Sequence, residues 1–244
     1  MNSVLTALRV FEEVARLQPV GLSDLARRLD VPKSTVQRCL KTLAEAGWVR
    51  SSAEGRWEIT GLAFRVGSAV AGRDNLREVA LPELSALQIS TGETVHLAVP
   101  DGDELVLIER LDSSHQLRAF MALGTRLPLH AAATGKAFLA TLSDERIAAY
   151  LSQAPAKATE HTVTDVEKLW QEIHLIRQCG YATTIEGLHD GISAVAVALR
   201  GRYGPARACF SISGPSSRLT PARFEDYGAR ALAVRSAVER LLGR

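Results

Sequence analysis

The chain has 244 residues, enough for two domains and for a sizeable buried core. With 46% apolar and 23% charged residues it has the composition of an ordinary globular protein, and no apolar run approaches the roughly 18–20 residues of a membrane span. The net charge of +2 says nothing about partners by itself. Cys39, Cys179 and Cys209 show no metal-ligand spacing. Their odd number and the lack of a signal sequence predict a cytoplasmic protein without disulfides.

The first predicted element is a helix from Ser3 to about Leu17, because Ser3 suits the N-cap position and Gln18-Pro19 ends the pattern. We expect this helix to cover the back of the two-helix unit that follows. The apolar residues expected on its buried face are Val4, Leu8, Phe11 and Ala15.

Residues 21–47 contain two short amphipathic helices on either side of a tight break. Asp30-Val31-Pro32 interrupts the apolar spacing, and a proline suits the first turn of a new helix. The second helix, Pro32 to Ala46, has no acidic residue as far as Ala44. Its apolar face consists of Val36, Cys39, Leu40 and Leu43, and its polar face of Ser34, Gln37, Arg38 and Lys41.

This two-faced helix is typical of the recognition helix of a helix-turn-helix. Arg and Gln can bind base edges in the major groove of DNA, while Ser, Thr and Lys hold phosphates. Residues 1–60 hold nine Lys and Arg residues against seven acidic ones, and three of the nine lie in the acid-free segment. A small helical hairpin with a solvated basic face would show the same pattern, so the helix alone leaves both interpretations open.

The segment after this helix favours DNA binding. Gly47 is suited to end the helix, and Trp48–Arg50 and Arg56–Ile59 are predicted to pair as a β-hairpin. Two helices followed by such a hairpin form a winged helix-turn-helix, whose partner is double-stranded operator DNA. The predicted DNA contacts are Ser34, Thr35, Gln37, Arg38, Lys41, Arg50 and Arg56.

Residues 61–74 are predicted to form a linker helix. The segment is apolar and rich in Gly and Ala, and small residues permit the close approach of a second helix. It is either a dimer contact or a helix docked on its own domain, and the sequence leaves these alternatives open. The expected apolar stripe consists of Leu62, Val66, Ala69 and Val70.

Residues 75–244 are predicted to form an α+β domain with a largely antiparallel sheet, since runs of strands alternate with helices and have hairpin-like connections. The expected helix Thr164–Cys179 has a capping box of Thr164 and Glu167, and Gly180 ends it. The expected strands are Thr94–Val99, Leu105–Ile108, Leu117–Met121, Tyr181–Ile185, Ile192–Leu199 and Ala206–Ile212, the last two joined by a turn at Tyr203-Gly204. The expected helices are Asn75–Ser90, Gly135–Leu142, Asp144–Leu151, Thr164–Cys179 and one from Thr220-Pro221 to about Leu242.

Several short motifs, taken in order, resemble those of the IclR (isocitrate lyase regulator) family of bacterial transcription factors. Each is weak alone, but their order and spacing are specific and cover essentially the whole chain. They are PKSTVQR at 32–38 followed by Leu43, GWV at 47–49, TGETV at 91–95, PLH at 128–130, GKAFLA at 135–140, GYA at 180–182 with Glu186, and SISGP at 211–215.

This resemblance implies a winged helix-turn-helix at 1–60, a linker helix at 61–74 and a GAF-like effector-binding domain at 75–244. It implies a transcriptional regulator, repressor or activator, that binds palindromic operators as a homodimer or a dimer of dimers. Many members of the family control the catabolism of small acids and aromatic compounds, so the expected effector is a carboxylate or an aromatic compound.

The resemblance also implies where the effector binds, between the sheet and the loop that enters the GKAFLA helix, here residues 131–134. Backbone N–H groups at a helix N-terminus could hold a carboxylate there. Thr184 and Ala194 replace an acidic residue and a cysteine common in the family, which favours a larger or more apolar ligand than a two-carbon acid. His189 could reach the ligand, although a surface-loop histidine is the favoured interpretation. The residues expected around the effector are Ala132, Ala133, Thr134, Leu117, Phe120, Thr184, Ala194, Ser211 and Ser213.

Catalysis has little support in the sequence. Gly135-Lys136 lacks the glycine that a phosphate-binding loop needs five residues earlier, because that position is His130. There is no G-x-S-x-G and no H-E-x-x-H, and the six histidines show no ligand spacing, so no catalytic residue, metal or cofactor is expected. Two alternatives remain: an enzyme with an accessory DNA-binding-like domain, and a C-terminal part that serves only dimerisation.

Overall fold

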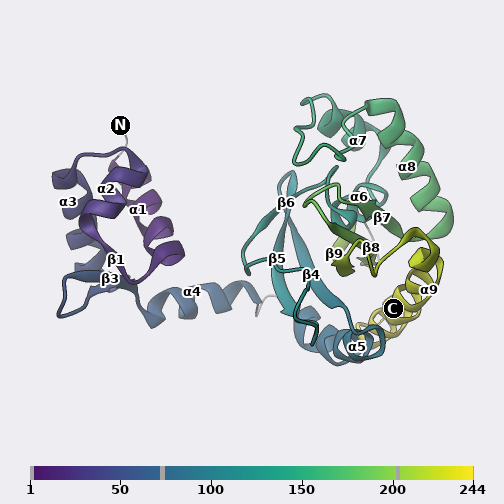
Figure 1. The fold of residues 1–244 in the computed structure, drawn as a ribbon. Helices are drawn as coiled ribbons and strands as arrows, with labels where there is room; N and C mark the ends of the chain where they lie inside the picture. Colours follow the sequence, from purple (N-terminus) through teal and green to yellow (C-terminus); the bar gives the residue numbers. More distant parts are fainter. Residues whose placement is uncertain (1–2, 72–74, 202–203, 244) are drawn as a thin grey trace. The chain divides into compact units, whose positions relative to one another are not determined.

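Figure 1 shows the fold in a computed structural model, which describes residues 3–71, 75–201 and 204–243. The chain divides into two compact units, Met1–Asn75 and Leu76–Arg244. No helix in the described ranges is long and apolar enough to cross a membrane.

The first unit is a small helical bundle with a three-stranded antiparallel sheet in the order β1-β3-β2. Its helices and its hairpin lie where the sequence predicts them, and the short strand β1 was not predicted. The elements in chain order are α1 (Ser3–Leu17), β1 (Val20–Gly21), α2 (Leu22–Leu29), α3 (Lys33–Glu45), β2 (Val49–Ser51), β3 (Arg56–Ile59) and α4 (Gly61–Ala71). The fully buried residues of its core include Val10, Val14, Leu25, Val36 and Leu40.

The buried face of α1 differs from the prediction. Val4 and Leu8 are 65% and 52% exposed, whereas Val10 and Val14 are fully buried. Because α1 has apolar residues on more than one face, spacing alone could not identify the face that packs against α2 and α3. Of the four predicted residues, Phe11 does pack against the core of the first unit. Its ring meets that of Trp48 edge-on at a centroid distance of 5.4 Å.

The second unit has three layers built on a six-stranded antiparallel sheet in the order β6-β5-β4-β9-β8-β7, which confirms the predicted fold class. Helices α6, α7 and α8 cover one face, and α5 and α9 cover the other (Figure 1). The strands are β4 (Thr94–Asp101), β5 (Glu104–Leu111), β6 (Arg126–Pro128), β7 (Ala182–Ile185), β8 (Ile192–Arg200) and β9 (Ala206–Pro215). The helices are α5 (Leu76–Thr91), α6 (Ala133–Leu139), α7 (Asp144–Leu151), α8 (Val166–Cys179) and α9 (Phe224–Leu241), the last preceded by a 3₁₀ turn at Pro221–Arg223.

Strand β8 contributes to both cores, because successive side chains of a strand point to opposite faces of the sheet. The residues facing α5 and α9 are large, Val195, Val197 and Leu199. Those on the α6 side are small, Ala194, Ala196 and Ala198, so they occupy less of the space beneath that helix.

Residues Leu117–Met121 do not form the predicted third strand; the edge strand next to β5 is β6 instead. Side chains, rather than a neighbouring strand, bind the backbone of this segment. Thr94 Oγ1 donates to the carbonyl of Ala119 at 3.1 Å, and Arg110 Nη1 donates to that of Met121 at 2.6 Å. The prediction of a third strand at Leu117–Met121 was therefore wrong.

Three helix ends also differ from the prediction. Asp165, not Thr164, caps α8, because its carboxylate accepts from the Lys168 N–H at 2.8 Å. Helix α6 begins two residues earlier than predicted and ends at Leu139. Gly180 ends α8 with a positive φ of 85°, as predicted. Tyr203, in the predicted last turn, lies outside the described residues.

Candidate functional site

The second helix of the helix-turn-helix, α3, presents two chemically distinct faces. Val36, Cys39 and Leu40 are buried in the first unit. The chain turns tightly before α3, where Asp30 has a φ of 51° and the Val31 N–H donates to the Ala26 carbonyl at 3.1 Å. The residues on the opposite side, Ser34, Gln37, Arg38 and Lys41, are exposed, and Thr35 is half-buried.

The two arginines of the predicted wing have protein partners. Arg50 and Glu58 lie directly opposite each other on β2 and β3, with Arg50 Nη2 3.2 Å from Glu58 Oε2. Arg56 Nη1 donates to the Pro19 carbonyl at 3.1 Å. Both guanidinium groups are on exposed residues, so a phosphate could reach them, but at Arg50 it would compete with the carboxylate of Glu58.

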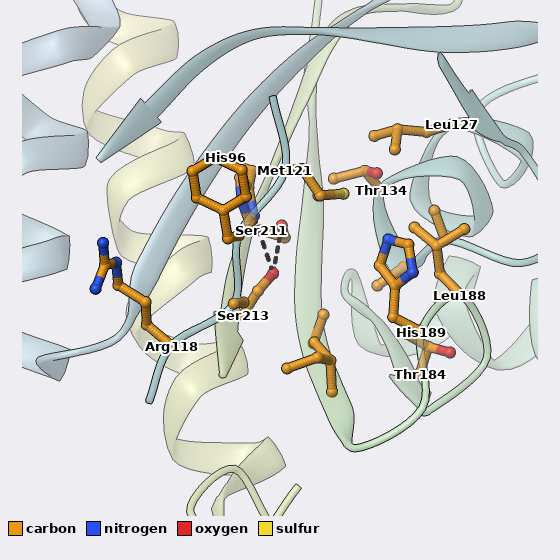
Figure 2. A pocket seen from close by; sticks show the side chains of 16 residues that line it. His96, Arg118, Met121, Leu127, Thr134, Thr184, Leu188, His189, Ser211 and Ser213 are labelled. Atoms are coloured by element: carbon orange, nitrogen blue, oxygen red, sulfur yellow. Dashed lines mark hydrogen bonds between the residues drawn. The ribbon is translucent and has the colours of Figure 1, made fainter. Parts of the chain in front are cut away.

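The second unit contains a cavity of about 290 Å³ on the α6 side of the sheet. His96 and Ser213 lie on one side of it, and Thr184, Leu188 and His189 on the other (Figure 2). The lining residues are His96, Leu127, Thr184, Ile192, Ala194, Ser211 and Ser213 from the sheet, Ala132, Ala133 and Thr134 at the start of α6, residues 118–121, and Leu188 and His189.

A row of three polar side chains forms the sheet side of the cavity. His96 and Ser211 are paired across β4 and β9, and Ser213 lies two residues further along β9 on the same face. His96 Nδ1 is 3.3 Å from Ser213 Oγ, and the two serine oxygens are 3.0 Å apart. All three residues are buried, and burial, together with the positive charge of Arg110, lowers the pKa of His96 to about 4. The row is therefore uncharged near neutral pH.

The opposite wall is held close to α6. Thr184 Oγ1 donates to the Ala131 carbonyl at 3.4 Å, and Gly187 lies against the Thr184 hydroxyl. Ala132 precedes the first residue of α6 and supplies no side-chain cap. A Cβ added at Gly135 would lie 2.5 Å from the Leu129 backbone, so the helix approaches the preceding chain closely.

The segment 117–121, which leads into the cavity wall, is held by an ion pair whose carboxylate is buried. Arg218 donates from Nε and Nη2 to the carboxylate of Glu93 at 2.7 and 2.8 Å, and from Nη2 to the Leu117 carbonyl at 2.9 Å. Glu93 is only 3% exposed. Arg110 stacks on the ring of Phe120 at 4.0 Å from its centroid. These contacts keep residues 117–121 in place although they belong to no strand.

The structure brings eight of the predicted effector residues to this one cavity: Phe120, Ala132, Ala133, Thr134, Thr184, Ala194, Ser211 and Ser213. Leu117 is not among its lining residues and is 65% exposed. His96 was not predicted to line the cavity; its signal in the sequence was a histidine within a largely apolar strand. His189 was expected at a plain surface position; it is exposed but lines the cavity as well.

Two charged features have structural explanations. Lys136 of the GKAFLA motif is buried and paired with Glu172, with Nζ 2.7 Å from Oε2. In the described part of the chain, one group has metal-ligand chemistry, His161, Glu186 and Asp190, with ligand atoms within 4.8 Å of one another. Hydrogen bonds from the Gly191 N–H and the Ser216 hydroxyl lower the pKa of Glu186, so this carboxylate already has partners.

Comparison with known proteins agrees with both units. The family described as "Bacterial transcriptional regulator IclR C-terminal" matches residues 68–240, and the "IclR helix-turn-helix domain" matches residues 3–53. The transcriptional repressor AllR of Escherichia coli K12 is 37% identical over 210 residues, which cover 85% of this chain and 78% of AllR.

Solved structures share the fold. The IclR of Thermotoga maritima aligns with a TM-score of 0.82 and 28% identity over all of both chains. An IclR homologue from Microbacterium hydrocarbonoxydans, complexed with 4-hydroxybenzoate, aligns with a TM-score of 0.80 and 24% identity over 98% of this chain and all of its own. The protein therefore belongs to the IclR family of bacterial transcriptional regulators, a family of DNA-binding proteins and not of enzymes.

Proposed function

We propose that a small organic effector, a carboxylate or an aromatic compound, binds in the cavity of the second unit and controls operator binding by the first. In this proposal residues 1–60 are the DNA-binding domain, 61–74 the linker and 75–244 the effector-binding domain. The observation that carries it is the cavity itself. An apolar space with a few converging polar groups is the usual form of a small-molecule site.

The size of the cavity suits a ligand with a single ring. A cavity of about 150 Å³ can hold benzene, so 290 Å³ leaves room for a ring with polar substituents. Thr184 and Ala194 are small and uncharged, and Leu127, Leu188 and Ile192 add apolar surface. An aromatic acid therefore fits the walls better than a two-carbon acid, which would bury little of that surface.

The proposed DNA contacts are Ser34, Thr35, Gln37, Arg38 and Lys41 on α3, with Arg50 and Arg56 on the hairpin. Support comes from the exposure of the polar face of α3 and from the burial of its other face. Such a helix can enter the major groove without exposing the core of its own domain.

The test has two arms. The first is a thermal-shift screen against benzoate, 4-hydroxybenzoate, propionate and glyoxylate, in which a bound ligand raises the melting temperature. The second measures the affinity for a duplex that the purified protein selects from a random library, with and without the ligand found. An effector should change this affinity by about 5–150-fold.

Ala194→Leu fills the cavity and should abolish the thermal shift, whereas Ser34→Ala on α3 should leave it intact and weaken DNA binding alone. Ligand binding without any change in DNA affinity would contradict the control mechanism, because only a difference in affinity between two states can shift an equilibrium. No thermal shift from any of these acids would contradict the proposed ligand class.

A further inference from the structure

His96 is a buried histidine with only one satisfied ring nitrogen. Nδ1 is bonded to Ser213, but Nε2 has no hydrogen-bond partner among the residues that the structure describes. Buried polar atoms are rarely left unpaired, since the loss of water without a replacement bond is unfavourable. His130 shows the usual arrangement, with Nδ1 2.7 Å from the Tyr150 hydroxyl and Nε2 2.8 Å from the Ala156 carbonyl.

The unpaired atom belongs to a hydrogen-bonded row that has two possible proton arrangements. His96 is neutral near pH 7, so one ring nitrogen donates and the other accepts. If Ser213 donates to Nδ1, then Nε2 carries the ring proton and Ser211 donates to Ser213. If Nδ1 donates to Ser213, then Ser213 donates to Ser211, Nε2 becomes an acceptor and the proton of Ser211 is free.

Both arrangements offer a ligand one hydrogen-bond donor and one hydrogen-bond acceptor. In the first, Nε2 donates and Ser211 Oγ accepts; in the second, their roles are exchanged. His96 and Ser211 are cross-strand neighbours on the same face of the sheet, and both line the cavity. This part of the wall therefore suits a group that donates one hydrogen bond and accepts another.

We propose that Nε2 of His96 and Oγ of Ser211 together bind a hydroxyl group of the effector, because a hydroxyl donates and accepts through one oxygen. The inference rests on the proposed effector pocket and narrows its ligands to small, largely apolar hydroxy compounds such as hydroxylated aromatic acids.

A carboxylate fits this end of the cavity less well. It can only accept, and it would be buried against uncharged groups, which is costly without a cation. Among the described lining residues the arginine is Arg118, whose side chain is 39% exposed and extends away from the serines in Figure 2. The acid group of a hydroxy acid is therefore expected away from the serines, and the hydroxyl at His96.

Access to Nε2 requires a side chain to move, because this atom is buried. Met121 lines the same cavity as His96 and is only partly buried. Its unbranched side chain has three rotatable bonds and can change rotamer without disturbing the sheet. A ligand that displaces Met121 would then supply the missing partner.

The experiment compares matched ligands that differ by one hydroxyl: benzoate with 3- and 4-hydroxybenzoate, and propionate with lactate. Isothermal titration calorimetry on the full-length protein should show at least one hydroxylated member binding about tenfold or more tightly than its partner, since a site that bonds a hydroxyl rejects the analogue without it. Chemical shifts of ¹⁵N-labelled histidine should show Nε2 of His96 responding to that ligand.

Three variants test the assignment to His96 and Ser211. His96→Asn keeps a polar group near Nδ1 but has none at the position of Nε2, so the preference should be lost. His96→Gln carries an amide close to that position and should keep part of the preference. Ser211→Ala should lose it too, whereas Ser193→Ala should not, because Ser193 is a buried serine bonded to another hydroxyl, Ser216, away from the cavity.

The outcomes separate this inference from the proposed function. Equal binding of hydroxylated and non-hydroxylated partners, or a preference unchanged in both His96→Asn and Ser211→Ala, overturns the inference and leaves the pocket standing. Failure of every acid to bind overturns the proposed ligand class and this inference together. Circular dichroism of each variant confirms that it is folded. If either His96→Asn or Ser211→Ala fails to fold, the other variant still tests the inference.

Discussion

His96 couples folding to pH, because its ring is neutral in the folded protein and can protonate freely in the unfolded chain. Burial lowers its pKa from 6.5 to about 4, with smaller effects from Arg110 and His189, which lower it, and from Asp112, which raises it. Between these values the unfolded chain binds more protons. The stability is therefore complete above pH 6.5 and falls toward pH 4, by up to about 3 kcal/mol.

Urea unfolding at neutral pH and near pH 4.5 would measure this effect in the wild type and in His96→Asn. Asparagine does not titrate, so the wild-type protein should lose stability relative to the variant as the pH falls. A difference in the free energy of unfolding that stays constant with pH would show that the pKa of His96 does not change on folding.

Arg38 is the residue of α3 best suited to contact a base, because it is exposed on the polar face and can form two parallel hydrogen bonds with guanine. Arg38→Ala should cost about 1–3 kcal/mol of binding to the selected operator and relax its sequence preference. Lys41→Ala is the control and should weaken binding to all duplexes alike. If Arg38→Ala also weakens all duplexes equally, then Arg38 contacts only phosphate.

At the scale of elements, the position of α6 depends on Gly135. An added Cβ would lie 2.5 Å from the Leu129 backbone, and backbone cannot move as a flexible side chain does. Gly135→Ala should therefore shift α6, destabilise the second unit by about 1–3 kcal/mol, and weaken ligand binding, since Ala133 and Thr134 line the cavity.

Gly67→Ala in α4 is the matched control, because nothing lies within 4 Å of a Cβ added there. Alanine favours a helix over glycine by about 1 kcal/mol, so this variant should be neutral or more stable. Denaturant unfolding of both variants and a thermal-shift titration with the ligand are the measurements. Unchanged stability and ligand binding in Gly135→Ala would contradict the close approach.

At the scale of the whole molecule, we propose that the chain forms a homodimer or a dimer of dimers. A single recognition helix contacts only a few base pairs, so a specific site needs two. Apolar side chains are exposed on both α1 and α4 of the first unit, where Leu5 is 56%, Phe64 82% and Val66 48% exposed. Ala69 and Val70, in the predicted stripe of α4, have side chains outside the described residues.

Phe64→Glu should shift the protein toward smaller species in sedimentation-velocity ultracentrifugation, because it places a charge on this apolar surface. The operator affinity should fall in parallel, since two half-sites would no longer be bound together. The exposed control Glu45→Gln should leave the sedimentation profile unchanged. A Phe64→Glu profile identical to that of the wild type would contradict a dimer contact on α4.

Local patterns determined most of the helices and the helix-turn-helix. Apolar spacing and capping residues act within a few positions of the chain, so α2, α3 and the glycine that ends α8 could be predicted from the sequence alone. The resemblance to the IclR family added the position of the pocket, since composition and spacing do not show which strands meet a helix end.

Only the tertiary structure decided features that depend on partners distant in the chain. It selected the face of α1 that is buried, held Leu117–Met121 outside the sheet through Thr94, Arg110 and Arg218, and paired Arg50 with Glu58. It also brought His96 next to serines more than a hundred positions away, with one ring nitrogen unpaired. The sequence by itself determined the family and the order of the helices, because motifs, apolar spacing and capping residues are local patterns. The polar chemistry of the cavity follows from strand pairing, which no local pattern specifies.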